Sequence, residues 1–240
     1  EPLPSTPLHQ DTMQLNDLKH PALTLSATLD GYRVEIDPAR QRADIVLCRP
    51  PFNVISMTQR EQLRITFEAL DANDDVRVIV LRSEGEHFSS GGNIGGFLEA
   101  SPEHVSKLAW NVAAPARCSK PVIARVQGDC YAGGVGLVAA CDMVVAIEQA
   151  GFCLSETRLG LIPATISPYV IRAIGERAAR RYFLTAERFD AAEARRIGLV
   201  HEVTDEASLD TEVGKLVEAL LACSPHALDE AKRLIRDVSC

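Results

Sequence analysis

Basic residues are in the minority in this chain of 240 residues, which contains 25 Lys and Arg against 33 Asp and Glu. The net charge of −8 disfavours nucleic acid or an anionic membrane surface as the main partner, because both are bound by basic patches. The sequence also lacks a long apolar run, since the longest candidate, 132–146, is interrupted by Asp142. A membrane-spanning helix needs about 20 apolar residues, so we expect no membrane partner.

The spacing of the cysteines and histidines argues against a disulfide-rich or metal-binding protein. The seven cysteines contain no C-x-x-C pair and the six histidines are scattered, so we expect neither a disulfide framework nor a metal site. Reduced and mostly buried thiols are typical of a cytoplasmic protein.

Residues 1–25 lack a basic start followed by an apolar core. We therefore expect a flexible N-terminal arm there rather than a secretory signal, and the sequence leaves open whether the arm is native.

Predicted strands and helices alternate along the first two thirds of the chain. Short apolar or β-branched segments predict strands at 43–48, 76–82, 121–126 and 143–147. A capping box at Thr58–Glu61 predicts a helix that runs to about Asp71. Further helices are expected from Ser167 as N-cap, after Asp190 as N-cap, at 206–222 and at 225–238. This order indicates α/β layers and then a helical tail, which packs on a neighbouring subunit or on its own core.

Two glycine-rich loops, 88–97 (FSSGGNIGGF) and 128–136 (GDCYAGGVG), each follow a predicted strand and precede a helix. Neither has the spacing of a dinucleotide fingerprint or a P-loop, and no G-x-S-x-G marks a nucleophilic serine. One interpretation is a pair of tight turns that bind nothing. The other is that each loop offers one backbone N–H to the same oxygen, which would make an oxyanion hole.

Six motifs follow one another along the chain. They are Arg49-Pro50 with Asn53, F-S-S-G-G-N-I, P-V-I-A-R-V-Q-G, A-G-G-V-G-L-V-A-A-C-D, F-C-L-S-E-T-R-L-G-L-I-P and A-A-E-A-R-R-I-G-L-V. In these motifs the chain resembles the crotonase family, also called the enoyl-CoA hydratase/isomerase superfamily, from about Asp44 to Asp237. The resemblance implies an α/β fold with a crotonase-like ββα spiral core at 26–166. It also implies a helical C-terminal oligomerisation region at 167–240, in a homotrimer or homohexamer.

The resemblance further implies a substrate and a site. The N–H groups of Gly92 and Gly133 would hold the thioester oxygen of an acyl-CoA while an enolate forms. Other positions would line the bound substrate, namely Asn53, Ser90, Gly91, Asn93, Ile94, Gly134 and, as a shaper of the pocket, Tyr131. For the side chain of Asn93, capping of the next helix is an equally open interpretation. No metal or redox cofactor is needed, because coenzyme A arrives as part of the substrate.

Hydration of a C2=C3 double bond needs a base for the water and an acid for C2. The best-known hydratases of the family use two glutamates, and the resemblance places the first at Gly136, where this chain has no carboxylate. The second is Glu156, in L-S-E-T-R-L-G, which is therefore the predicted acid/base. An apolar acyl pocket would raise its pKa towards neutrality. A structural ion pair with Arg158, or a simple surface position, is the alternative.

Three functions are compatible with a single glutamate. The first is a hydratase of a branched 2-enoyl-CoA, the second a 3-enoyl to 2-enoyl isomerase, and the third a CoA-ester-binding protein with little turnover. The C-terminal half, from 132 onwards, resembles bacterial 3-methylglutaconyl-CoA hydratases of leucine breakdown, whereas 88–104 resembles them less. We hypothesise that Arg158 or a nearby polar group meets the second carboxylate of such a substrate.

Overall fold

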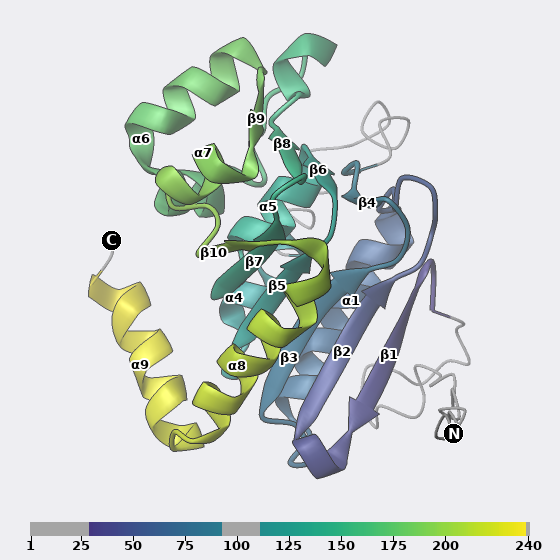
Figure 1. The fold of residues 1–240 in the computed structure, drawn as a ribbon, viewed down its shortest axis with the longest axis vertical. Coiled ribbons are helices and arrows are strands. Elements are labelled where there is room, and N and C mark those ends of the chain that lie inside the picture. The colour runs from purple at the N-terminus through teal and green to yellow at the C-terminus, as the bar shows by residue number, and fades with distance from the viewer. Residues whose placement is uncertain (1–28, 93–110, 239–240) are drawn as a thin grey trace.

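The computed structural model describes residues 29–92 and 111–238, and these form two β-sheets with helices around them (Figure 1). The larger sheet has six strands in the order β1-β2-β3-β5-β7-β10. Their bounds are β1 Tyr32–Asp37, β2 Arg42–Leu47, β3 Val78–Ser83, β5 Val122–Val126, β7 Met143–Ile147 and β10 Glu202–Thr204. The pair β1–β2 is antiparallel and the other pairs are parallel. The predicted α/β order is confirmed.

The smaller sheet contains four strands of three residues each, in the order β4-β6-β8-β9. Their bounds are β4 His87–Ser89, β6 Asp129–Tyr131, β8 Gly151–Cys153 and β9 Arg188–Asp190. The strands β4, β6 and β8 pair in parallel, and each follows directly on a strand of the larger sheet. The chain thus repeats a unit of long strand and short strand, and the ends of β4 and β6 lie side by side.

Burial explains why the central strands of the larger sheet are apolar on both faces. In β3 every residue from Val78 to Leu81 has no exposed surface, as expected for parallel strands covered on both sides. Helix α1 (Met57–Asp71) lies behind this sheet in Figure 1, and α8 (Leu209–Leu221) lies in front of it. The sheet and these two helices bury one continuous core.

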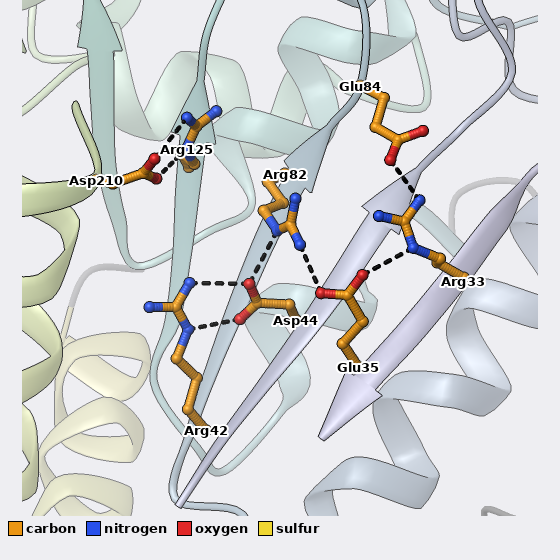
Figure 2. Close-up of polar contacts among 8 residues, drawn as sticks. All are labelled: Arg33, Glu35, Arg42, Asp44, Arg82, Glu84, Arg125 and Asp210. Carbon is orange, nitrogen blue, oxygen red and sulfur yellow. Dashed lines mark hydrogen bonds and ion pairs between the residues drawn. The ribbon is translucent and has the colours of Figure 1, made fainter. Parts of the chain in front are cut away.

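One face of the larger sheet carries a ladder of ion pairs across β1, β2 and β3 (Figure 2). Asp44 is its centre, because its carboxylate binds Arg42 at 2.5 Å and Arg82 at 2.9 Å. Arg82 also binds Glu35 at 2.6 Å, so the ladder joins all three strands. The neighbouring pair of Arg125 with an aspartate of α8 links β5 to that helix. Partly exposed pairs of this kind stabilise a fold by at most about 1 kcal/mol each.

The remaining helices lie mostly in the C-terminal third. Their bounds are α4 Ala114–Arg117, α5 Gly133–Ala139, α6 Ser167–Thr185, α7 Ala191–Arg196 and α9 Pro225–Val238, with short 3₁₀ turns η2 Pro38–Arg40, η3 Glu156–Leu159 and η4 Glu206–Ser208. The expected cap of α7 is confirmed, since Asp190 accepts a hydrogen bond from the backbone N–H of Glu193 at 2.8 Å. Helix α6 is interrupted at Gly175, which has φ +73°.

Two expected N-caps are wrong. Helix α1 is capped by Ser56, whose Oγ accepts the backbone N–H of Gln59 at 3.0 Å, and Thr58 lies inside the helix. Helix α6 follows Ile166 as its N-cap residue, so that Ser167 is already helical. Both prediction errors amount to one or two residues, because neighbouring Ser and Thr residues offer similar local capping patterns.

The proposed C-terminal region is interwoven with both sheets. Strand β9 pairs with β8, and β10 pairs with β7, although both come after residue 166. The division at residue 166 stays a prediction, as does the role of the helices in assembly. Within the two described stretches, no helix has the length and apolar character that crossing a membrane requires.

Candidate active site

One pocket is lined by both glycine loops, the first turns of α1 and the η3 segment. Its polar lining includes the backbone at Gly92 and Gly133 and the residues Arg60 and Glu156, besides Asn111 and Thr165. Its apolar lining includes Ile55, Leu63, Phe67, Leu137, Ile162 and Ile166. The four chemistry-bearing positions therefore face one largely apolar space, into which an acyl chain can be placed.

The two predicted oxyanion positions are neighbours. The Cβ atom that Gly133 lacks would stand 3.4 Å from the backbone nitrogen of Gly92. Gly133 is the first residue of α5, so its N–H has no acceptor within the helix. The parallel pairing of β4 with β6 brings the loops together, because the two strands end at the same edge. The structure thus brings Gly92 and Gly133 close together, and the role of their N–H groups towards a thioester stays a prediction.

The first loop requires glycine at Gly91. Its φ is +90°, and a Cβ there would stand 2.9 Å from the backbone nitrogen of Gly133. Its carbonyl accepts the N–H of Ile55 at 2.8 Å, and its own N–H donates to Oγ of Ser89 at 3.1 Å. These bonds hold the loop beside α5, so Gly91 sets the position of its neighbour Gly92.

The second loop is held in an unusual backbone conformation. Ala132 has φ +47° and ψ −119°, a region that non-glycine residues rarely adopt. Such a conformation costs about 1–3 kcal/mol, and the surrounding structure has to hold it. The N–H of Ala132 donates to the carbonyl of Cys153 at 2.8 Å, which ties the turn to β8. This turn places the next peptide, with the N–H of Gly133, at the pocket.

Asn53 has a structural role in this arrangement. Its side chain is 2 % exposed, accepts the N–H of Arg49 at 2.8 Å, and donates to the carbonyls of Glu84 and His87 at 2.8 and 2.9 Å. These bonds occupy the amide group, so the side chain is not free to bind a ligand. A contact between the backbone of this turn and coenzyme A stays a prediction.

Glu156 begins η3 and lines the same pocket as the glycine loops. Burial raises the pKa of its carboxyl group, with a smaller opposing effect from a hydrogen bond to its own backbone. Its Oε2 atom is buried and has no hydrogen-bond partner among the described residues. A raised pKa and an unsatisfied oxygen at a pocket are features of a proton-transfer group. Arg158 is exposed and outside the pocket lining, and no ion pair joins it to Glu156 in the described part of the chain.

Gly136, the position at which the resemblance implies the first glutamate, is buried and closely packed. A Cβ at this position would stand 2.1 Å from Cγ2 of Ile166, a distance that real atoms do not reach. The space for a second catalytic carboxylate is therefore occupied by Ile166. Among the described residues that line the pocket, Glu156 is the one carboxylate.

Arg60 is a pocket residue that the sequence analysis missed. It is 8 % exposed and lies one turn into α1, where its burial lowers the pKa of the guanidinium to about 10. The available signal was its spacing from Leu63 and Phe67, since the three residues occupy one stripe of the helix. An arginine within a buried stripe is uncommon and marks a candidate for function.

Other predicted positions lie at or beyond the edge of the site. Ser90 is partly exposed and donates its N–H to the carbonyl of Phe52 at 2.8 Å. Gly134 packs under the first loop, because a Cβ there would stand 2.7 Å from the carbonyl oxygen of Ser89. Tyr131 is not among the described lining residues. Its hydroxyl donates to Asp129 at 2.6 Å. Asn93 and Ile94 lie outside the described residues.

Comparison with known proteins assigns the chain to a family. The family described as Enoyl-CoA hydratase/isomerase matches residues 41–238. The chain belongs to this family. The enoyl-CoA hydratase AKT6-1 of Alternaria alternata is 35% identical over 210 residues, with 86% of this chain and 70% of that protein covered. The peroxisomal Δ(3,5)-Δ(2,4)-dienoyl-CoA isomerase of Arabidopsis thaliana is 30% identical over 239 residues, with 88% and 86% covered.

Solved structures of the enoyl-CoA hydratase/isomerase family agree with the fold. An enoyl-CoA hydratase from Shewanella pealeana superposes with a TM-score of 0.84 at 32% identity, with 95% of this chain and 84% of that chain covered. The predicted crotonase fold is therefore confirmed, and the chain is an enzyme of the enoyl-CoA hydratase/isomerase family. The narrower likeness to 3-methylglutaconyl-CoA hydratases is not shown by these comparisons.

Proposed function

We propose that this enzyme hydrates a 2-enoyl-CoA thioester, with Glu156 as its single catalytic carboxylate. The observation that carries the proposal is one pocket whose lining contains the unsatisfied carboxylate of Glu156 together with Gly92 and Gly133. Relatives that are named as enoyl-CoA hydratases support the choice of reaction.

Each group has a defined part in the proposed reaction. The carboxylate of Glu156 takes a proton from water as the oxygen of that water bonds to C3. The electron pair of the C2=C3 bond becomes the C1=C2 bond of the enolate as the pair of the C=O bond moves onto the thioester oxygen, where the N–H groups of Gly92 and Gly133 stabilise it. The same proton then passes from Glu156 to C2, and the enolate returns to a thioester. One group can act as base and then as acid because the two steps follow each other.

Isomerisation of a 3-enoyl-CoA to a 2-enoyl-CoA is the second candidate, and a specific observation favours it. The position of the other family glutamate is closed by the contact of Gly136 with Ile166, so one carboxylate has to do all the proton transfer. An isomerase needs one carboxylate, which removes a proton from one carbon and returns it to another, and no water takes part. A relative named as a dienoyl-CoA isomerase is consistent with this reaction.

The narrower proposal is a branched, glutaconyl-type substrate, as in leucine breakdown. It rests on the likeness of the segment from 132 onwards to such hydratases. Arg158 gives it no support, because this exposed side chain lies outside the pocket lining. A dicarboxylic ester would have to find another cation, and Arg60 is the arginine in the described lining.

We also propose a cytoplasmic homotrimer or homohexamer that needs no metal or redox cofactor. The helical region after residue 166 would supply its interface. Helix α9 supports this proposal, since Leu234, Ile235 and Val238 are each more than 60 % exposed on it. An exposed apolar stripe on a terminal helix is typical of a surface that another subunit covers.

Turnover of three esters tests the proposed function. Purified enzyme is given a linear 2-enoyl-CoA, a linear 3-enoyl-CoA and 3-methylglutaconyl-CoA, and the products are identified by mass. Addition of one water to a 2-enoyl ester is expected, and conversion of the 3-enoyl ester at constant mass would establish the isomerase instead. No turnover of any ester, despite tight binding, would overturn both reactions in favour of a binding protein.

A matched pair of variants assigns the reaction to the pocket. The variant Glu156→Gln removes the proton-transfer group and is expected to lose about 10²–10⁴-fold in turnover. The control Glu148→Gln makes the same chemical change at an exposed turn after β7, and full activity is expected. Equal activity of both variants would exclude Glu156 as the acid/base.

A further inference from the structure

Arg60 occupies an unusual place for a charged residue. Together with Leu63 and Phe67 it forms one stripe of α1, and all three side chains line the active-site pocket. Leu63 and Phe67 are apolar and lie further along the helix. Arg60 is 8 % exposed, and burial of a guanidinium is costly. A cation retained at a ligand pocket under that cost is a candidate for work on the ligand.

Two distances measured from the same atom position place Arg60 next to the glycine loops. The Cβ atom that Gly133 lacks would stand 3.4 Å from the nitrogen of Gly92 and 3.7 Å from Nη2 of Arg60. That same point is only one bond from Cα of Gly133. The backbone nitrogen of Gly92 and the guanidinium of Arg60 therefore both lie close to Gly133.

The guanidinium keeps its charge in this environment. Burial lowers the pKa of Arg60 to about 10, which still leaves it protonated at neutral pH. A charge in a water-poor pocket acts more strongly than one at the surface, because solvent screens it less. Its field therefore favours any negative charge that develops at the two N–H groups.

We propose that Arg60 is a third member of the oxyanion hole, in which its guanidinium faces the thioester oxygen together with the N–H groups of Gly92 and Gly133. The inference rests on the proposed function, because it concerns the oxygen that becomes negative when the enolate forms. Two neutral N–H groups stabilise this oxygen through their dipoles, and Arg60 adds a full positive charge. Such a group acts more strongly on the transition state than on the uncharged ester.

The charge also bears on the lone carboxylate. A cation beside the enolate oxygen stabilises the enolate, so the step that forms it, in which the oxygen of water bonds to C3, becomes easier. The activation barrier of this step is then lower, which makes it easier for Glu156 to act as the only base. In this way Arg60 compensates in part for the glutamate that Gly136 replaces.

A spectroscopic titration tests the proposal without turnover. Acetoacetyl-CoA is bound to the enzyme, and the pH at which its C2 proton is lost is followed through the ultraviolet absorbance of its enolate. The wild-type enzyme is expected to lower the pKa of the bound ester below that of the free ester. In Arg60→Met the enolisation constant is expected to fall tenfold or more, and in Arg60→Lys by a smaller factor. An unchanged constant in Arg60→Met overturns the proposal.

A neighbouring arginine provides the control. Arg64 follows one turn later on α1, pairs with Glu68 at 2.6 Å and lines a separate cavity. The variant Arg64→Met removes a charge from the same helix and is expected to leave the enolisation constant unchanged. Thermal melting of all variants shows whether each is folded. If Arg60→Met does not fold, Arg60→Lys provides the test in its place. An equal fall in Arg64→Met would show a general effect of charge and overturn the proposal.

Steady-state kinetics separates this role from recognition of a substrate carboxylate. Arg60→Met is expected to lower kcat about 10–100-fold on a linear 2-enoyl-CoA and on 3-methylglutaconyl-CoA alike, with little change in KM. A loss confined to the dicarboxylic ester would show that Arg60 binds its second carboxylate, and would overturn the proposal. Failure of the wild-type enzyme to bind acetoacetyl-CoA would overturn the proposed function itself, together with this inference.

Discussion

The side chain of Ile166 fills the space that a side chain at position 136 would need. A Cβ on Gly136 would stand 2.1 Å from Cγ2 and 2.5 Å from Cβ of Ile166. Gly136 is therefore matched by a residue directly before α6. Because these two positions fit each other, the packing of the site leaves no room for a larger side chain at position 136.

Gly136→Ala is expected to destabilise the enzyme by about 1–3 kcal/mol, because its methyl group overlaps Ile166. Ile166→Gly removes the overlapping atoms at a position where glycine is tolerated as an N-cap. In the double variant the added destabilisation by Gly136→Ala should largely disappear, and urea unfolding measures it.

The control for this cycle is Gly214→Ala in α8, where an added Cβ meets nothing within 4 Å. This substitution should stabilise the helix by about 0.5–1 kcal/mol. Strictly additive effects of Gly136→Ala and Ile166→Gly would contradict the packing explanation.

The pH dependence of kcat/KM should reveal Glu156. Burial raises the pKa of this carboxyl group, and the ionised form is the one that accepts a proton. The rate is therefore expected to fall as the pH drops through the raised pKa, at a higher pH than an ordinary glutamate would produce. Rates between about pH 4 and pH 9 measure this limb. A limb at the pH of an unperturbed glutamate would mean that another group controls the rate.

Glu156 should also make stability depend on pH. Its pKa is raised above the ordinary glutamate value of 4.5, so between these two values the folded state binds more protons than the unfolded state. The free energy of unfolding is then expected to decrease as the pH rises through this window, relative to Glu156→Gln, which does not titrate. Denaturant unfolding of both proteins at several pH values measures the difference. A difference that stays constant with pH would show that the carboxyl group is not desolvated.

Asn53→Ala is expected to destabilise the fold by about 2–4 kcal/mol. The substitution leaves the N–H of Arg49 and the carbonyls of Glu84 and His87 without their partner. It also removes a residue type that tolerates its φ of +46°. Urea unfolding gives the value.

Asn73→Ala is the matched control for this prediction. The side chain of Asn73 accepts one exposed hydrogen bond, from the N–H of Asp75 at 2.9 Å. A loss below about 1 kcal/mol is expected there. If Asn53→Ala were equally mild, its side chain would not hold the turn as the structure indicates.

Regular elements with a strong local pattern were predictable from the sequence. The strand at 143–147 and the helix at 225–238 have the expected bounds. The strands β4, β6 and β8 escaped prediction, because three residues are too few to show a period. The cap of α1 was placed two residues late, since Ser56 and Thr58 offer the same pattern. Contact of Ser56 with Asp30, far away in the sequence, distinguishes them.

Some residues of the candidate site were likewise predictable from the sequence, and others were not. Glu156, Gly92 and Gly133 were identified from motifs, and the structure brings all three to one pocket. The exposure of Arg158 was not predictable, because the direction of a side chain depends on how its turn packs. The place of Arg60 was indicated only by its spacing from Leu63 and Phe67. Arg60 faces the pocket from a buried stripe, whereas Arg158 is exposed on η3.

The sequence by itself determined the family and the α/β order of its longer elements, and it singled out Glu156, Gly92 and Gly133 as candidates, since all of these depend on residue types in local order. Only the tertiary structure decided that Ile166 packs against Gly136 and that Arg60 stands beside Gly133 and Gly92. These contacts join residues that are far apart in the chain. They follow from close packing of separate elements, which local propensity does not encode.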